Sequence, residues 1–186
     1  MGRPKTFSRE EVLQKALPVF WKHGYADTSV QELERATGVN KSGLYAEFAG
    51  KEDLFLQSLR YYLDTRQRRG LLTVQPLGWE NIERFLKFAP SNVEGQKGCF
   101  STSSLRELAI LPPEATSIVA ESRARLKQLL AENVAAADPK PGMAPEEVAE
   151  LVLTFFTGIS TEQNLNPARA AITRRIDNLL KMLRQP

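Results

Sequence analysis

The stretch Gly38–Phe48, with the sequence GVNKSGLYAEF, decides the fold prediction. Asn40 is a favourable N-cap residue, and Leu44 and Phe48 stand four residues apart, so a helix of about two turns with one buried side is expected after Asn40. The residues left facing outward are then Lys41, Ser42, Tyr45 and Ala46. This outward face is unusually polar for so short a helix.

Gly43 stands inside the expected helix, where glycine costs up to ~1 kcal/mol relative to alanine. A helix that served only for packing would be longer and would avoid this cost. We therefore interpret the glycine as a place where another molecule must come close to the backbone. The amides and the dipole at the start of this helix would favour a phosphate there.

Two capping patterns precede this stretch. Ser8 and Glu11 form a capping box that begins a first helix, and Thr28 and Gln31 repeat the pattern before a short second helix. Residues 29–48 therefore predict two short helices joined by a tight turn, which is the helix-turn-helix pattern.

The rest of the chain is also helical in pattern, without the alternation or the turn signals of β-hairpins. We expect an all-α protein of about nine helices, with an N-terminal three-helix helix-turn-helix domain and a C-terminal helical domain. The predicted parts are a DNA-binding domain at 1–50, a connecting helix at 51–69, a linker at Gly70–Gly78 and the second domain at 70–186.

The last two predicted helices suggest an interface between subunits. The segment Pro145–Ser160 is apolar on nearly every side, and the final helix repeats apolar residues every three or four positions. Two such helices from each of two copies would form a four-helix interface, and burial against the same subunit is the alternative. The predicted interface residues are Leu151, Phe155, Ile172, Ile176, Leu179 and Leu183.

Composition excludes several classes of protein. Hydrophobic residues make up 42% of the chain and charged residues 25%, which is ordinary for a globular protein. No run approaches the ~18 apolar residues of a membrane span, and the N-terminus lacks the apolar segment of a secretory signal, so a cytoplasmic location without membrane contact is expected. One cysteine, Cys99, and one histidine, His23, give neither an internal disulfide nor a metal cluster, and no metal or cofactor is expected.

Positive charge is concentrated in the first third. The chain has a net charge of +3, and up to Arg69 it has 12 Lys and Arg against 9 Asp and Glu, whereas the numbers are equal at 13 beyond it. This asymmetry permits an anionic partner at the N-terminal part. The alternative is that the arginines at the end of the connecting helix only complement its dipole.

The stretch from Phe20 to Leu54, FWKHGYADTSVQELERATGVNKSGLYAEFAGKEDL, resembles the DNA-binding region of TetR/AcrR-type transcriptional regulators. The resemblance covers about residues 8–60. It includes the motifs Gly24-Tyr25, Thr28-Ser29, Gly38-Val39, Leu44-Tyr45, Phe48 and Lys51-Glu52. It implies that the C-terminal helical domain is the effector and dimerisation domain. It also implies a homodimer that binds a palindromic double-stranded DNA operator and is released by a small molecule, although activation instead of repression stays open.

The same resemblance implies roles for single residues. Thr28, Tyr45 and Lys51 would bind phosphate, while Lys41, Ser42 and Gly43, in the helix that Asn40 caps, would approach base edges. Serine is usual where this chain has Asn40, and Gly-Thr is frequent where it has Ser42-Gly43, so the operator sequence is not implied. Arg3 and Lys5 in the N-terminal GRPK segment would lie in a minor groove, or the segment is simply a disordered terminus.

The sequence indicates the effector-binding residues less clearly than the DNA-binding residues. The candidate pocket residues are Phe85, Phe88, Cys99, Phe100, Ser103 and Phe155, and they predict a largely apolar effector. The alternative is that most of the aromatic residues belong to the hydrophobic core. For Cys99 the alternatives are a buried structural thiol and a sensor of oxidants or electrophiles.

Two other functions compete with regulation. An enzyme fused to a helix-turn-helix would need a nucleophile, a base and an orienting group, which one histidine and one cysteine do not supply, so no catalytic residues are expected. An architectural protein that binds DNA without sequence preference would show a larger basic excess than +3.

Overall fold

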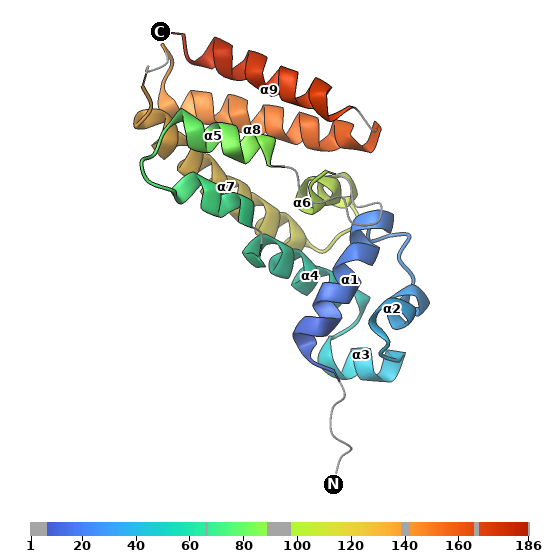
Figure 1. Cartoon of the computed structure of the whole chain (residues 1–186). Helices are drawn as coiled ribbons and strands as arrows, with labels where there is room; N and C mark the ends of the chain where they lie inside the picture. Colours follow the sequence, from blue (N-terminus) through green and yellow to red (C-terminus); the bar gives the residue numbers. More distant parts are fainter. Residues whose placement is uncertain (1–6, 66, 89–97, 139–141, 166–167, 186) are drawn as a thin grey trace. The chain divides into compact units, whose positions relative to one another are not determined.

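The computed structural model describes residues 7–65, 67–88, 98–138, 142–165 and 168–185 (Figure 1). Every regular element in these ranges is helical, which confirms the all-α prediction. The α-helices are α1 (Arg9–His23), α2 (Val30–Thr37), α3 (Lys41–Glu47), α4 (Lys51–Thr65), α5 (Trp79–Lys87), α6 (Phe100–Ser104), α7 (Pro113–Ala135), α8 (Pro145–Glu162) and α9 (Arg169–Leu183). Short 3-10 helices are η1 (Gln67–Thr73), η2 (Leu105–Glu107) and η3 (Gln163–Leu165). Within the described ranges, no helix is both long enough and apolar enough to cross a membrane.

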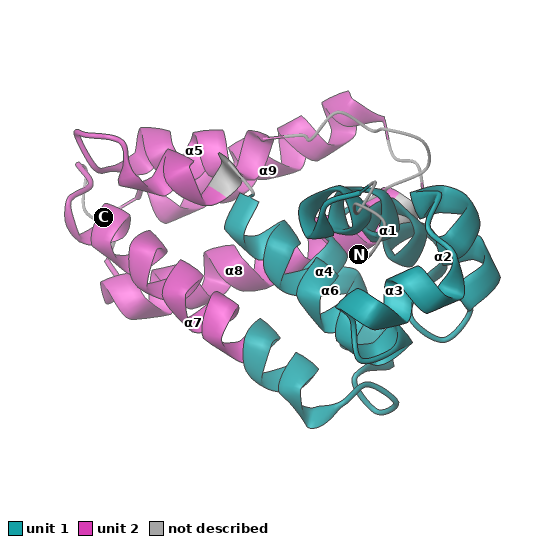
Figure 2. Cartoon of the chain, turned by 90° about the horizontal axis from the view of Figure 1, so that it is seen from below, with its two compact units in different colours: residues 1–65, 94–119 teal, residues 66–93, 120–186 magenta. Residues whose placement is uncertain are grey.

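The chain forms two compact units, which Figure 2 shows in different colours. The first contains residues 1–65 and 94–119, and the second contains residues 66–93 and 120–186. The first unit therefore holds α6, η2 and the start of α7 together with α1–α4. The predicted division of function between residues 1–50, 51–69 and 70–186 stays a prediction.

Capping side chains set the ends of the first helices. The capping box at the start of α1 is confirmed, because the Ser8 hydroxyl accepts a hydrogen bond from the Glu11 N–H and the Glu11 carboxylate accepts one from the Ser8 N–H. The second capping box lies one residue later than predicted, with Ser29 and Glu32 in place of Thr28 and Gln31. The reason is that the Thr28 hydroxyl turns back and donates to the carbonyl of Gly24, 2.6 Å away.

An aromatic cluster forms the core of the first unit. Phe55 of α4 makes edge contacts with Phe20 and Tyr25, at centroid distances of 5.2 and 5.3 Å, and Phe100 of α6 lies 5.7 Å from Phe55. Helix α4 is buried on more than one side, and its buried residues are Leu54, Phe55, Leu56, Ser58, Leu59 and Tyr62. Since α1 packs on α4, this helix supports both α1 and α6.

The predicted linker at Gly70–Gly78 is only partly correct. Helix α4 ends at Thr65 instead of Arg69, and η1 follows it with Leu72 fully buried. The composition of GLLTV indicated a linker, but Leu72 is buried in the core of the second unit, so this part of the segment is not a linker.

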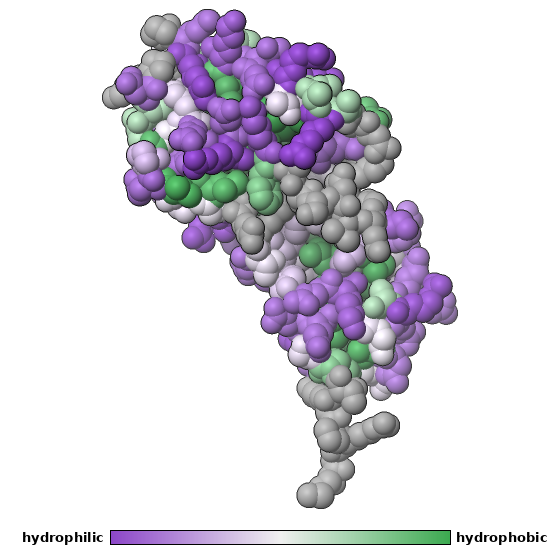
Figure 3. All heavy atoms as spheres, viewed as in Figure 1, coloured by the Kyte–Doolittle hydropathy of each residue, from purple (hydrophilic) through white to green (hydrophobic). Residues whose placement is uncertain are grey.

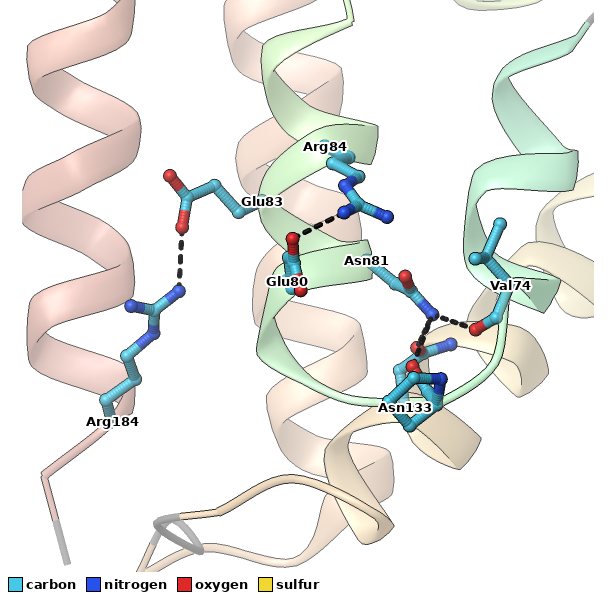
Figure 4. Close-up of polar contacts among 8 residues, drawn as sticks. Val74, Glu80, Asn81, Glu83, Arg84, Asn133 and Arg184 are labelled. Carbon is cyan, nitrogen blue, oxygen red and sulfur yellow. Dashed lines mark hydrogen bonds and ion pairs between the residues drawn. The ribbon is translucent and has the colours of Figure 1, made fainter.

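A buried pair of asparagines fixes this segment to α5 and α7 (Figure 4). The Asn133 amide donates to the Leu72 carbonyl at 2.8 Å, and its oxygen accepts from the Asn81 amide at 3.0 Å. The Asn81 amide also donates to the carbonyl of Val74 at 2.6 Å. Because Asn81 and Asn133 are 1% and 0% exposed, these hydrogen bonds replace those that water would make.

Helix α9 is held against its own subunit. It packs on α5, where Lys87 pairs with Asp177 at 2.6 Å and Arg184 with Glu83 at 2.9 Å; Figure 4 shows the second pair. The hydrogen bonds from Lys87 and Arg184 lower the pKa of Glu83, against the effect of its burial.

Two residues of the predicted interface are buried within the single chain, and the interface itself stays a prediction. Ile176 and Leu183 are 1% and 8% exposed within the single chain, because α9 turns this side toward its own unit. Ile172, Leu179 and Phe155 are half-buried, and Leu151 is exposed. On the face shown in Figure 3, the surface of the second unit is mainly hydrophilic.

Replacing Asn133 by alanine tests the asparagine pair. The substitution leaves the buried amide of Asn81 and the carbonyl of Leu72 each short of a partner, so we expect the free energy of unfolding to fall by about 3 kcal/mol. Urea unfolding at fixed protein concentration measures this change. Gln128→Ala, on the exposed side of the same helix, is the control and should stay within about 0.5 kcal/mol of the parent. An Asn133→Ala midpoint equal to the control's would contradict the assigned role.

Candidate nucleic-acid interface

Helix α3 has one buried and one exposed side, as the sequence predicts. Leu44 and Phe48 are 1% and 2% exposed, whereas Tyr45 is 42% exposed. The other exposed residues of the helix are Lys41, Ser42 and Ala46. The Lys41 ammonium lies 5.6 Å from the centroid of the Tyr45 ring, so a cation and an aromatic hydroxyl stand together on the exposed side. This side presents hydrogen-bonding groups to solvent on a backbone only seven residues long.

Other helices hold both ends of α3. At its start, the Asn40 side chain accepts from the Gly43 N–H at 2.8 Å and the Glu34 carboxylate of α2 accepts from the Lys41 N–H. At its end, the Arg9 guanidinium of α1 donates to the Glu47 carbonyl and lies 4.4 Å from the centroid of the Phe48 ring. The orientation of α3 is thus determined by α1 and α2.

These contacts correct one expectation about α3. Its N-terminal amides were expected to favour a phosphate, but those of Lys41 and Gly43 already bind side-chain oxygens. The Glu34 carboxylate also places a negative charge at this helix end. Binding of an anion by the start of α3 is therefore not retained.

The structure gives a different reason for a glycine at position 43 from the approach of another molecule that the sequence suggested. A Cβ atom at this position would lie 2.7 Å from Cγ1 of Val39 and 3.2 Å from Oδ1 of Asn40. Val39 is buried and β-branched, so its methyl group cannot turn away easily. Glycine is therefore needed at position 43 because Val39 and Asn40 of the preceding turn lie so close to its backbone. A contact between Gly43 and base edges stays a prediction.

Two predicted phosphate ligands are used inside the protein. The Lys51 ammonium donates to the carbonyls of Tyr25 and Thr28 at 2.8 and 2.9 Å and lies 4.4 Å from the centroid of the Tyr25 ring. The Thr28 side chain is 1% exposed and its hydroxyl is bound to Gly24. Both side chains fix the turn between α1 and α2, and a contact of either with phosphate stays a prediction. Burial, with a smaller effect of the Glu52 charge, raises the pKa of Tyr25.

The sequence reasoning missed the charged residues that stabilise this arrangement. Besides Arg9 and Glu34, the Lys15 ammonium donates to the Thr37 carbonyl at the end of α2, 3.4 Å away. Glu107 accepts hydrogen bonds from the N–H groups of Tyr25 and Ala26. No local pattern identifies these contacts, because each joins residues at least 22 positions apart, except that of Glu34, which joins residues 7 positions apart.

A cavity of about 300 Å³ lies in the first unit, between the end of α1 and the α6–η2 segment. Of the predicted pocket residues, Phe100 and Ser103 line it. Cys99 is 5% exposed and accepts a hydrogen bond from the Tyr62 hydroxyl at 3.3 Å, which agrees with a buried thiol. The remaining predicted pocket residues, Phe85, Phe88 and Phe155, belong to the second unit, and Arg3 and Lys5 lie outside the described residues.

Comparison with known proteins identifies relatives of this chain. Residues 12–57 match the family described as bacterial regulatory proteins, tetR family. The HTH-type transcriptional repressor ComR of Escherichia coli (strain K12) is 51% identical over 63 residues, which are 34% of this chain and only 30% of ComR. The HTH-type transcriptional repressor BdcR of the same strain is 26% identical over 164 residues, which are 87% of this chain and 81% of BdcR.

A solved structure extends the similarity over the whole fold. It is a cysteine mutant of the TetR family transcriptional regulator CifR, complexed with 26-base-pair double-strand operator DNA. It is 26% identical to this chain with a TM-score of 0.82, and the alignment covers 98% of this chain and 100% of CifR.

A pair of substitutions tests why position 43 is glycine. Alanine there gains up to ~1 kcal/mol of helix propensity but collides with Val39, so we expect Gly43→Ala to lower the free energy of unfolding by about 1 kcal/mol. In a Val39→Ala background the same substitution should be neutral or stabilising, which thermal or urea unfolding of the four proteins measures. Gly43→Ala that stabilises the parent chain and only weakens DNA binding would show that the glycine serves another molecule.

Proposed function

Since the chain is a TetR/AcrR-type regulator, we propose that it is a transcriptional repressor that binds a palindromic operator as a homodimer and is released by a small molecule. The observation that supports this most directly is the exposed side of α3, where Lys41, Ser42 and Tyr45 lie in solvent. Leu44 and Phe48, on the opposite side, are buried and anchor the helix to its unit. A relative of the same fold, CifR, is solved in complex with operator DNA. A DNA-bound repressor would work in the cytoplasm.

The proposed contacts follow from the geometry of α3. The major groove of DNA is about 12 Å wide and admits one helix, with base edges on its floor and phosphates along its walls. Lys41 and Ser42, in the first turn, would reach base edges, and the hydroxyl of the exposed Tyr45 would donate to a phosphate. Arg3 and Lys5 would add a minor-groove contact from the N-terminal arm.

Footprinting on genomic DNA in moderate salt tests this function. A repressor protects a discrete two-fold symmetric site whose half-sites lie about one helical turn, ~34 Å, or a multiple apart. Continuous protection without a preferred sequence would instead support the architectural alternative. Without any protection, the proposed function is wrong.

Variants of the exposed side of α3 then separate its roles. Lys41→Ala should lower affinity for the operator and relax the preference at one base position, which corresponds to about 1–3 kcal/mol. Tyr45→Phe should weaken binding about equally on all sequences, because only a phosphate contact is lost. Both are measured by fluorescence anisotropy on an operator and its single-base variants.

Lys181→Ala is the control for these variants, since it removes one exposed cation from α9 and leaves α3 unchanged. It should leave operator affinity unchanged. A Lys41→Ala variant that loses affinity equally on every sequence would contradict the base contact.

The homodimer would use the part of α8 and α9 that remains uncovered. Leu151 is 44% exposed and Met182 is 70% exposed, and Phe155, Ile172 and Leu179 are half-buried. A two-fold interface made by the same side chains from both copies would bury them. Ile176 and Leu183 would instead hold α9 in place beneath that interface.

Leu151→Glu tests this surface, because it places a charge in the apolar contact. We expect the dimer dissociation constant to rise at least tenfold in sedimentation experiments. Met143→Glu is the matched control, since Met143 is also 44% exposed and lies before α8. An unchanged dimer in Leu151→Glu would exclude this residue from the interface.

The small molecule would act by favouring a subunit arrangement that does not span both half-sites. Its effect on operator affinity equals the difference between its binding energies for the two arrangements, commonly ~1–3 kcal/mol. The cavity in the first unit, with Phe100 and Ser103 in its wall, is the candidate site within the described residues, and its volume of about 300 Å³ suits a small ligand.

A further inference from the structure

Glu107 binds the turn between α1 and α2 from a distant part of the sequence. Its two carboxylate oxygens accept hydrogen bonds from the N–H groups of Tyr25 and Ala26, at 2.8 and 2.9 Å. Glu107 ends η2, which follows α6 directly. Hydrogen bonds to an ionised carboxylate are stronger than those between neutral groups. The turn is thus tied to the α6–η2 segment by a carboxylate with both oxygens engaged.

Gly24 allows this close contact. Its φ of +80° favours glycine, and a Cβ atom at this position would lie 2.7 Å from Oε2 of Glu107 and 3.0 Å from its Cδ. The carboxylate therefore rests directly on the backbone of the residue that ends α1. The conformation favours glycine here, and a Cβ atom would displace the Glu107 carboxylate from its present position.

Lys51 binds the same turn, at the carbonyl groups of the turn residues. The ammonium donates to the Tyr25 and Thr28 carbonyls, while Glu107 accepts from the Tyr25 and Ala26 amides. The turn at 24–28 is accordingly fixed on its donor side by α6–η2 and on its acceptor side by α4. Loss of either contact leaves backbone groups of the turn without these partners.

A chain of contacts leads from this turn to the exposed side of α3. The turn ends at Ser29, the N-cap of α2, and the Glu34 carboxylate of α2 binds the first N–H of α3. Helix α2 has only eight residues, so its N-cap and the Glu34 carboxylate lie close together along the chain. The contacts of Glu107 with the turn and of Glu34 with α3 thus connect the α6–η2 segment with the start of α3 through α2.

The cavity lies beside this contact. Its wall is formed by Trp21, His23 and Asp27 from α1 and the turn, and by Ser103, Arg106 and Glu107 from the α6–η2 segment. A shift of either wall changes the distance between Glu107 and the two amides. The contact thus joins the candidate effector cavity to the helices that would bind DNA.

We propose that Glu107 is a positioning residue for DNA binding: its carboxylate holds the α1–α2 turn from the α6–η2 segment and so helps to place α2 and α3 for the contact with DNA. This inference rests on the proposed function, because its final readout is operator affinity. Glu107 itself touches no DNA in this account.

Glu107→Gln tests the proposal in the full-length protein, because it keeps the shape of the side chain but places an NH₂ group against one of the two N–H donors. We expect hydrogen exchange at the amides of Tyr25 and Ala26 to become at least tenfold faster and operator affinity to fall about tenfold. The slope of log affinity against log salt should stay the same, since no phosphate contact is lost. Far-UV circular dichroism verifies that the variant is folded.

Two further variants sharpen the test. Glu107→Asp keeps the charge but is one methylene shorter, so it should also lose affinity, which a purely electrostatic role would not predict. Glu114→Gln is the matched control, because Glu114 is an exposed carboxylate of the same unit that pairs with Arg60. It should change neither the exchange rates nor the affinity.

The outcomes distinguish this inference from the proposed function. If the parent protein binds its operator and Glu107→Gln binds it equally well, the inference is wrong while the proposed function stands. A reduced salt slope in Glu107→Gln would also overturn it, since the residue would then act through phosphate. A parent protein that protects no discrete DNA site would overturn both.

Discussion

Helices α2 and α3 have eight and seven residues, and isolated helices shorter than ~12–15 residues are marginal in water. Their stability therefore depends on side chains from elsewhere that bind the free N–H and carbonyl groups at their ends. Arg9 and Glu34 bind the two ends of α3, and Lys15 binds the last turn of α2. These contacts come from the inner side and the ends of the two helices, and the outer side of α3 remains exposed.

The same constraint decides which charges remain for a partner. The first third of the chain has the whole basic excess, but Arg9, Lys15 and Lys51 use their hydrogen bonds on the backbone of their own unit. Lys41 keeps its charge in solvent beside Tyr45. The number of basic residues therefore overstates the charge available to an anionic partner.

Local patterns predicted the fold well, since capping and apolar spacing act over three or four residues. The capping box at Ser8, the cap at Asn40 and the buried pair of Leu44 and Phe48 are all confirmed. Contacts between distant residues were not predictable in the same way. Glu107 meets a turn 81 positions earlier, and an apolar repeat in α9 does not reveal whether Ile176 faces its own subunit or another. The resemblance to a family also gave no sign that Lys51 and Thr28 both donate hydrogen bonds to carbonyl groups of the α1–α2 turn.

The most direct test of the account is the titration of isotope-labelled protein with its operator duplex, followed through the backbone amide resonances. The account predicts that the first and largest shifts occur at Lys41, Ser42, Tyr45 and Ala46, together with the N-terminal arm, and that the amide of Val39 beneath them changes less. If α3 resonances stayed unchanged while another surface responded to the duplex, the outer side of α3 would not be the DNA-binding surface.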